Sequence, residues 1–242
     1  MRKSPGSRPI PLLRSHGAAT DRMTSAINKV TSHLIMIELY TWSTPNGRKV
    51  SIMLEECSLP YRVHKIDIGK GDQFKPEYVA INPNSKIPSI VDPEGPDGKP
   101  IAMMESGAIL IYLSGKTGKL MPQSSREKYE VLQWLMFQMG GVGPMFGQAH
   151  HFLRAKKDEI PYGSERYGTE AKRLYGVMDR HLDDHQYFGK EYSIADIAIY
   201  PWVARHEWHR VDLGAFPNVK RWYDAVGARP AVAKGMSVPQ PN

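Results

Sequence analysis

The sequence predicts a protein of two parts, an α/β domain over residues 36–117 and an all-helical domain over residues 126–242, joined by a linker at 118–125. From residue 36, short apolar runs typical of strands alternate with helical patterns, in the order β-α-β and then β-β-α. After residue 118 the strand-like runs cease, and long helical periods separated by proline and glycine replace them. Residues 1–35 show no sustained apolar period and contain several prolines, so we expect a basic, disordered arm there.

The α/β domain begins with a short apolar run at residues 35–40, which suits a buried strand. Thr44 is placed to cap the helix that follows, Pro45 takes the first helical position, and Pro60 ends the helix. Three further strands are expected, at 62–67, 87–91 and 101–104. A helix capped by Ser106 is expected to close the domain.

The second domain is expected to contain four long helices, at 126–139, 161–182, 194–205 and 219–226. Ser193 and Asp196 lie three residues apart at the start of one of them, which is the spacing of a capping box. We assign this pair a structural role in the core helix and no catalytic one.

The positive charge of the chain lies mostly in its first 35 residues. The formal net charge is +7, and residues 1–35 contain six basic residues against one acidic residue, which accounts for +5 of it. The rest lacks a basic stripe interleaved with aromatic residues, so we expect no nucleic-acid partner. No uninterrupted apolar run approaches the roughly 18 residues of a membrane-spanning helix, so we expect no membrane span.

The basic arm has three possible interpretations. Its arginines and serines resemble a mitochondrial transit peptide, but the arm is equally a flexible extension, and translation could instead begin at Met23 or Met36. We favour the last two over a transit peptide. A secretory signal is not expected, because no apolar segment follows the basic start. We therefore expect a cytoplasmic protein, or a mitochondrial one if the arm is a transit peptide.

The cysteine count limits the chemistry. Cys57 is the only cysteine of the 242 residues, which excludes an intrachain disulfide, a Cys-x-x-Cys pair and a cysteine-rich zinc site. Its position on the apolar face of the first helix favours a core residue over a nucleophile. Thiol chemistry in this protein must therefore take its second sulfur from a ligand.

Two histidine pairs raise the question of a metal. Adjacent His150 and His151 point apart, and His206 and His209 lie far from them in the sequence. A zinc site needs three or four converging ligands, so we expect no metal. We expect His150 and His151, with Gln148, to line a polar rim of the cleft instead.

Three short motifs carry candidate chemistry. Thr44-Pro45-Asn46-Gly47 is by itself most often only a helix start, yet the amino end of a helix stabilises a nearby thiolate, and the Thr44 hydroxyl and Asn46 amide can donate hydrogen bonds to it. Tyr40 and Ser43 are competitors for the sulfur contact; we prefer Thr44 because it also caps the helix.

The other two motifs lie beside the remaining strands. The segment 82–88 ends in an Ile-Pro step before a strand, and if the bond before Pro88 is cis, the Ile87 backbone is free to pair with an extended peptide. Ser106 with the amide groups after it forms a second anion site, and the Glu105 carboxylate suits an amino group beside that anion.

These motifs together resemble those of glutathione transferases, over residues 36 to about 232. The matching segments are Thr-Pro-Asn-Gly at 44–47, Asn-Pro-Asn-Ser-Lys-Ile-Pro at 82–88, Glu-Ser-Gly-Ala-Ile at 105–109 and Tyr-Ser-Ile-Ala-Asp at 192–196. With Asp-Ile-Gly-Lys-Gly-Asp-Gln-Phe at 67–74, they look like the Nu class. The resemblance implies a thioredoxin-like domain with a cis Pro88, followed by an all-helical domain.

The resemblance also implies roles for single residues. Thr44 and Asn46 would face the sulfur of glutathione, and the Ile87 backbone would pair with its cysteinyl unit. Glu105 and Ser106 would hold the γ-glutamyl end. Three further positions match residues expected at the remaining polar groups or at the closing edge of the site: Gln73, Lys86 and Arg166.

The function implied by the resemblance is reduction of disulfides by bound glutathione, with a second glutathione completing the reaction and no protein cysteine as nucleophile. Glutathione is thus expected as a co-substrate, without a metal, and the chain is expected to form a homodimer. Two alternatives remain, namely conjugation of glutathione to electrophiles and a regulatory protein that binds glutathione without turnover.

Overall fold

The computed structural model describes residues 36–156 and 159–240, and the chain from Ile37 onward forms one compact unit. The predicted arm at 1–35, with its three interpretations, lies outside the described residues. Within the described part of the chain, no helix is long and apolar enough to cross a membrane.

The first half of the unit is built on a four-stranded sheet in the order β2-β1-β3-β4. The strands are β1 (Ile37–Thr41), β2 (Tyr61–Lys65), β3 (Ser89–Asp92) and β4 (Ile101–Met104). β2 pairs with β1 in parallel, whereas β3 is antiparallel to both β1 and β4. The peptide bond between Ile87 and Pro88 is cis. The mixed sheet and the cis bond agree with the predicted thioredoxin-like fold.

Helix α2 (Pro45–Cys57) follows β1 and ends as the sequence predicts. Thr44 is extended (φ −122°, ψ 161°), and its hydroxyl oxygen accepts the Gly47 N–H at 3.2 Å, which caps the helix. The chain then leaves through Ser58 in the left-handed region (φ 57°). The apolar face of α2, which includes Cys57, is buried, and Lys49 is buried beside it.

Helix α4 (Ser106–Thr117) begins one residue earlier than expected. Ser106 is the first helical residue and not the cap; the cap position belongs to Glu105, whose φ of 66° is unusual for a residue with a side chain. Its carboxylate makes no capping hydrogen bond. The prediction of a Ser106 cap is therefore wrong, because the turn out of β4 is made by the Glu105 backbone.

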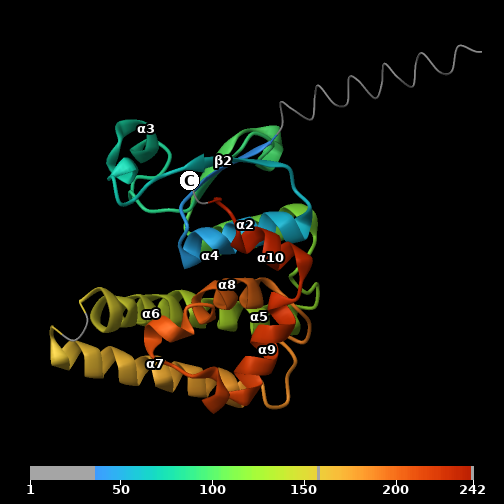
Figure 1. The fold of residues 1–242 in the computed structure, drawn as a ribbon. Helices are drawn as coiled ribbons and strands as arrows, with labels where there is room; N and C mark the ends of the chain where they lie inside the picture. The colour runs from blue at the N-terminus through green and yellow to red at the C-terminus, as the bar shows by residue number, and fades with distance from the viewer. Residues whose placement is uncertain (1–35, 157–158, 241–242) are drawn as a thin grey trace, which may run out of the picture. The chain divides into compact units, whose positions relative to one another are not determined.

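The second half of the unit consists of helices and turns. Figure 1 shows the long helices of both halves in layers below the sheet. The layer next to the sheet contains α2, α4 and α10 (Pro230–Met236), and α2 packs against both of the others and against α8 (Ile194–Val203). Farther from the sheet lie α5 (Ser125–Phe137), α6 (Gly143–His150), α7 (Pro161–His181) and α9 (Pro217–Gly227).

The remaining elements are short helical turns. They are η1 (Asp72–Phe74), η2 (Pro96–Gly98), η5 (His206–His209) and η6 (Leu213–Ala215), the two π-helical turns η3 (Gln138–Val142) and η4 (His151–Ala155), and the single-turn helix α3 (Pro76–Val79). The sequence analysis did not predict α6 or α10. The glycines and the proline of α6 suggest a break, but π-helical turns carry the helix through them without one.

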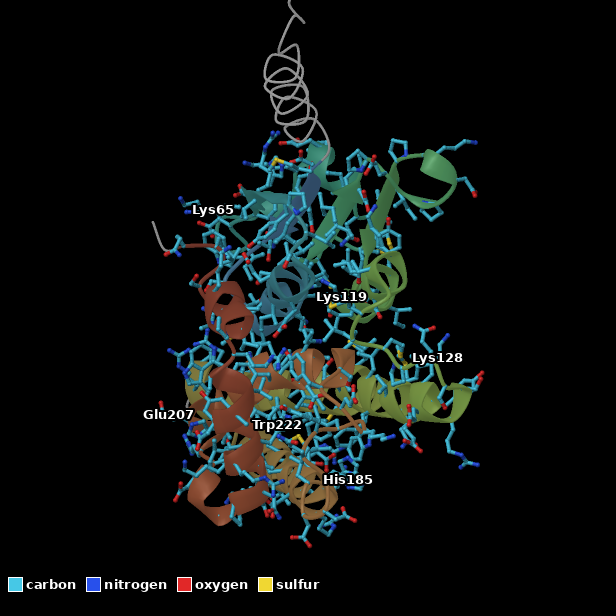
Figure 2. All side chains as sticks on the ribbon, turned by 90° about the vertical axis from the view of Figure 1, so that its right-hand side faces the viewer. Lys65, Lys119, Lys128, His185, Glu207 and Trp222 are labelled. Carbon is cyan, nitrogen blue, oxygen red and sulfur yellow. The ribbon has the colours of Figure 1, made fainter. Side chains whose placement is uncertain are left out.

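The predicted capping box at α8 is confirmed and lies at the centre of the helical core. The buried Asp196 carboxylate accepts the Ser193 N–H (2.9 Å) and the Phe188 N–H (3.1 Å). It also accepts the indole N–H of Trp222 at 2.8 Å, and Figure 2 shows Trp222 among these helices. A buried carboxylate is stable only when it is hydrogen-bonded, so this carboxylate joins α8 to α9.

Close packing of α10 on α2 gives a testable prediction about stability. A Cβ atom on Gly235 would lie 2.5 Å from the Ile52 Cα and 2.6 Å from the Ile52 nitrogen. Because both atoms belong to a helix backbone, Gly235→Ala should force α10 off α2 and lower the free energy of unfolding by about 1–3 kcal/mol. Chemical denaturation measures this change.

The matched control is Gly115→Ala on the exposed face of α4, where an added Cβ meets no atom within 4 Å. Alanine there should raise the free energy of unfolding by about 0.5–1 kcal/mol, because glycine is the more flexible residue in the unfolded chain. Equal effects at the two positions would contradict the packing argument.

Candidate active site at the ends of three strands

The sheet register gathers most of the predicted site residues at one end of the sheet. Tyr40 near the end of β1 pairs with Ser89 at the start of β3, and Ser89 pairs with Met104 at the end of β4. Because β3 is antiparallel to both β1 and β4, its start lies beside their ends. Three segments therefore lie side by side: the turn into α2, the Ile87–Pro88 step and the turn into α4. β2 runs parallel to β1, so the segment that carries Gln73 leaves from the same end.

The amino end of α2 presents hydrogen-bond donors to this region. The Thr44 oxygen is engaged with the Gly47 N–H, which leaves the Thr44 hydroxyl hydrogen free to donate. Pro45 has no N–H and the Arg48 N–H bonds to the Thr44 carbonyl, so the Asn46 N–H is the unpaired amide of the first turn among the described residues. The partial positive charge of a helix amino end favours an anion here.

Gly47 is required for this geometry. A Cβ atom at Gly47 would lie 2.4 Å from both the Thr41 hydroxyl oxygen and the Trp42 carbonyl oxygen. Only glycine lets the end of β1 pack this closely on the first turn of α2.

A residue distant in sequence fixes the side chain of Asn46. The Trp202 indole N–H donates to the Asn46 amide oxygen at 3.1 Å, from α8 in the helical half. An indole can only donate, so the Asn46 oxygen faces Trp202 and the amide NH₂ is left to donate elsewhere. The sequence analysis placed Asn46 at the site but did not identify Trp202 as its partner.

The two rival candidates for the sulfur contact, Ser43 and Tyr40, have contacts of their own. The Ser43 hydroxyl oxygen accepts a hydrogen bond from the Arg48 guanidinium at 2.9 Å. Tyr40 stacks on His64 with ring centroids 4.5 Å apart, and burial raises the pKa of its phenol. These contacts leave the hydroxyl hydrogens of Ser43 and Tyr40 free, as they do that of Thr44, so the preference for Thr44 rests on its place as the cap of α2.

The loop before β3 holds its own backbone in place and leaves Ile87 free. The Lys86 carbonyl accepts hydrogen bonds from the Tyr78 hydroxyl and the Asn82 amide, both at 2.6 Å. In contrast, the N–H and C=O of Ile87 have no hydrogen-bond partner among the described residues. This is the free backbone edge that the sequence analysis predicts, while the Lys86 side chain is exposed.

Gln73 lies in η1 with one half of its amide unused. Its amide nitrogen approaches the Ile68 carbonyl at 3.4 Å, while its amide oxygen is buried without a hydrogen-bond partner. A buried acceptor without a donor costs stability, so this oxygen is suited to a ligand N–H.

The amino end of α4 forms a second group of donors. The Ile109 N–H bonds to the Glu105 carbonyl, and the amide groups of Ser106, Gly107 and Ala108 have no partner within the described chain. The Glu105 carboxylate is exposed and forms no ion pair there. A carboxylate of a ligand suits the three amides, and a cationic amino group suits Glu105.

Lys49, which the sequence analysis did not single out, supports this second group from behind. It is 1% exposed, and its ammonium nitrogen lies 3.2 Å from the Ser106 hydroxyl and 2.6 Å from the Gln138 amide oxygen. Burial lowers the pKa of Lys49 from 10.5 to about 7, while the nearby Glu105 charge opposes the shift. Lys49 thus joins α2, α4 and the π-helical turn η3 at one buried polar contact.

Arg166 is not brought to the site by any contact in the structure. It is exposed on α7, with its guanidinium 5.9 Å from the Tyr167 ring. No contact in the described part of the chain joins it to Thr44, Ile87 or Glu105. Its predicted role in closing the site stays a prediction.

Cys57 lies away from the donors described above. Its side chain is 5% exposed at the far end of α2, with its sulfur 3.4 Å from the Thr117 hydroxyl. Burial raises the pKa of its thiol, which disfavours the thiolate. This agrees with the prediction that Cys57 is a core residue.

The histidines form a hydrogen-bonded chain rather than a ligand set. His209 lies between Tyr175 and His150, at 3.0 Å from the Tyr175 hydroxyl and 2.7 Å from the His150 ring nitrogen. In the described residues there is no group of three or more potential metal ligands. His150 and His151 line an open cavity of about 570 Å³ together with Gly147; Gln148 does not line it, and their predicted place at the rim of the ligand cleft stays a prediction.

The sequence matches the models of two protein domains. Residues 44–116 match the model for the glutathione S-transferase N-terminal domain, and residues 144–230 match that for the C-terminal domain. The disulfide-bond oxidoreductase YfcG of Escherichia coli K12 is 49% identical over 203 residues, which cover 83% of this chain and 94% of YfcG.

Solved structures show the same similarity. A glutathione transferase from Pseudomonas putida, with one glutathione disulfide bound per subunit, superimposes with a TM-score of 0.82 at 48% identity and covers 84% of this chain and 92% of its own. A glutathione transferase from Burkholderia graminis, with two glutathione molecules bound per subunit, has a TM-score of 0.82 at 44% identity. That match covers 96% of this chain and 99% of the other.

Proposed function

Because the chain belongs to the glutathione S-transferase family, we propose that it is an enzyme that reduces disulfide bonds with bound glutathione as the thiol. The observation that carries the proposal is the amino end of α2. It offers the Thr44 hydroxyl, the Asn46 side-chain NH₂ and an unpaired backbone N–H, and it contains no cysteine. Such a site stabilises the thiolate of a ligand and has no sulfur of its own.

In the proposed complex, glutathione lies across the three strand ends. Its cysteinyl unit pairs with the free Ile87 backbone, and its γ-glutamyl carboxylate accepts from the amides at the start of α4. The γ-glutamyl amino group meets Glu105. Gln73 and Lys86 bind the remaining polar groups, and Arg166 closes the site from α7.

The chemistry requires two thiols. The thiolate of bound glutathione attacks one sulfur of the disulfide; a new S–S bond forms between them, the old one breaks, and the other half leaves as a thiolate that takes a proton from water. A second glutathione thiolate then attacks the mixed disulfide, so that two thiols and one glutathione disulfide result. Lowering the glutathione pKa from about 8.5 toward neutral raises the thiolate fraction while keeping the sulfur nucleophilic.

Several relatives support disulfide reduction over the alternatives. YfcG is named as a disulfide-bond oxidoreductase, and the P. putida structure contains glutathione disulfide. Conjugation to electrophiles and a regulatory role without turnover remain the competing functions. We further propose a cytoplasmic homodimer, as the family resemblance implies.

The test is a titration combined with a turnover assay. We expect the thiol of bound glutathione, followed by its ultraviolet thiolate absorbance, to ionise with a pKa at least about one unit below the ordinary value near 8.5. We also expect turnover with a small neutral disulfide, and Cys57→Ala should retain it. Ionisation identical to that of free glutathione would overturn the proposal.

Turnover distinguishes the competing functions. A protein that binds glutathione without reducing any disulfide would be a regulator. Faster reaction with an aromatic halide than with a small disulfide would make conjugation its main activity.

A further inference from the structure

Three arginines lie close together near the cavity that His150 lines, and we call Arg48, Arg154 and Arg205 the arginine cluster. The Arg154 and Arg205 guanidinium carbons lie 3.6 and 4.0 Å from the centre of the Trp208 ring. Arg154 and Trp208 line the cavity of about 570 Å³ together with His150. Arg48 lies on the first turn of α2, one residue before Lys49.

Among the residues that the structure describes, no acid forms an ion pair with this positive charge. None of the three arginines forms an ion pair with a described residue, and the Nε atoms of Arg48 and Arg205 are buried without a hydrogen-bond partner. The neighbouring acid, Glu207, forms no ion pair in the described chain and lies at the outer edge of the view in Figure 2. An arginine donates through five N–H groups, so the exposed guanidinium of Arg154, which lines the cavity, has donors available to an anion.

The charges of the cluster act on one another. Burial lowers the pKa of Arg205, and the positive charges of Arg48 and Arg154 lower it further. Burial and the charges of Arg205 and Arg154 also lower the pKa of His150 to about 4, so His150 is neutral at neutral pH. Holding like charges together in a partly buried place is unfavourable, and a bound anion would relieve the repulsion.

His150 adds a directed donor to the cavity. Tyr175 is fully buried, and its hydroxyl forms its hydrogen bond with the His209 Nδ1. Because an unpaired buried O–H is unfavourable, the Tyr175 hydroxyl donates to this nitrogen. His209 then donates from Nε2 to the Nε2 of His150, whose remaining proton is on Nδ1. The Nδ1–H of His150 is thus left to donate to a ligand.

The arginine cluster is connected to the proposed sulfur site. His150 stacks on Trp202 with centroids 5.6 Å apart, and Trp202 donates to Asn46 beside Thr44. On the other side, Arg48 donates to Ser43, the residue before Thr44. The positive cavity therefore adjoins the place where the proposed disulfide would react.

We propose that the arginine cluster and His150 form a subsite for the anionic half of the substrate, so that the enzyme prefers disulfides whose departing thiol carries a carboxylate. This inference rests on the proposed function and adds the substrate class. The departing half leaves as a thiolate with its carboxylate still bound by the guanidinium groups. Screening by salt should weaken the preference, since the charges are partly exposed.

The experiment compares three disulfides of similar size that differ in charge: dithiodipropionate (dianionic), bis(2-hydroxyethyl) disulfide (neutral) and cystamine (dicationic). We expect kcat/KM to be about tenfold higher for the dianion than for the dication at low salt, and the ratio to fall as salt rises. Arg154→Gln and Arg205→Gln should each remove most of this preference while changing reduction of the neutral disulfide less than twofold.

Two variants control for structural effects. Arg154→Lys keeps the charge and should keep most of the preference. Arg126→Gln removes an exposed arginine from the start of α5 and should leave the preference for the dianion unchanged. Helix α5 lies far from the cluster: Figure 2 shows Lys128, on α5, and Glu207, beside the cluster, on opposite sides of the molecule.

The outcomes separate this inference from the proposed function. Equal kcat/KM for all three disulfides, or a preference unchanged in Arg154→Gln and Arg205→Gln, would overturn the anionic subsite while leaving disulfide reduction intact. If the protein reduces no disulfide, calorimetric binding of dithiodipropionate decides: tighter binding to the native chain than to the two glutamine variants supports the subsite, and equal binding refutes it.

Discussion

Replacing Thr44 by valine should lower kcat/KM for disulfide reduction at neutral pH by about tenfold to a hundredfold. Valine has the shape of threonine but no hydroxyl, so the sulfur of glutathione loses one donor. A hydrogen bond to a charged group contributes about 1.5–3 kcal/mol, which corresponds to a loss of this size. The pKa of the bound thiol should rise by about one to two units in the same variant, as measured by its thiolate absorbance.

The Thr44→Val variant also loses the cap of α2, and this effect must be separated from the first. The Thr44 oxygen accepts the Gly47 N–H, so loss of the cap should cost about 0.5–2 kcal/mol of stability. Thr44→Gly removes the hydroxyl but weakens the helix start by only roughly a few tenths of a kcal/mol, and Thr44→Ser retains both the hydroxyl and the capping oxygen. We expect Thr44→Ser to stay within a fewfold of native activity.

The two explanations predict different results for these variants. If catalysis depends on the hydroxyl, Thr44→Gly should be as impaired as Thr44→Val, although it destabilises the helix less. If Thr44→Val reduced disulfides at the native rate, the sulfur contact would have to be reassigned to another donor of this turn.

Features that depend on neighbouring residues could be predicted from the sequence. The Thr44 cap, the Pro45 start and the Ser193–Asp196 capping box each involve residues within three positions of one another, so their spacing determines the hydrogen bonds. The succession of strands and helices along the first domain followed from the apolar runs, whereas the thioredoxin-like sheet was expected from the family resemblance. The cis bond before Pro88 was expected from the Ile-Pro step and the family resemblance.

Features that depend on distant residues could not be predicted in this way. Trp202 reaches Asn46 across 156 positions, and Lys49 reaches Gln138 across 89. In the sequence, Lys49 is one charged residue in a helix, and nothing local indicates that it is buried. The arginine cluster could not be predicted either, because its members come from α2, from η4 and from the turn between α8 and η5.

The misplaced cap of α4 has a different cause. A serine before an apolar run usually caps a helix, but here Glu105 takes the cap position with a left-handed backbone, which lets Ser106 turn inward to Lys49. Local preference predicted the common arrangement, and the tertiary contact favoured another. The departure occurs beside the proposed γ-glutamyl site, where an unusual backbone conformation is often found in functional proteins.

Buried Lys49 should make the stability of the protein depend on pH. Its pKa is about 7 in the folded chain and 10.5 ordinarily, so between these values the unfolded chain holds a proton that the folded chain releases. The free energy of unfolding therefore rises with pH in this window, by at most about 1.4 kcal/mol per pH unit. From pH 7 to pH 9, Lys49 should add about 2 kcal/mol to stability.

Lys49→Met removes the titrating group while preserving most of the side-chain volume. Urea denaturation of the native chain and of Lys49→Met at pH 7 and pH 9 should show that the difference between them shifts by about 2 kcal/mol in favour of the native chain. Lys128→Met is the matched control. Lys128 is exposed on α5 (Figure 2), so its surroundings change little on unfolding and the difference should stay constant.

The same variant tests why a lysine is kept in so costly a place. If Lys49 orients Ser106 for the γ-glutamyl carboxylate, Lys49→Met should raise KM for glutathione severalfold with little change in kcat, because the thiolate donors on α2 remain. If the free energy of unfolding changed with pH equally in the native chain and in Lys49→Met, Lys49 would stay charged when buried. The charge itself, rather than a neutral hydrogen-bonded amine, would then hold Ser106 and Gln138 together.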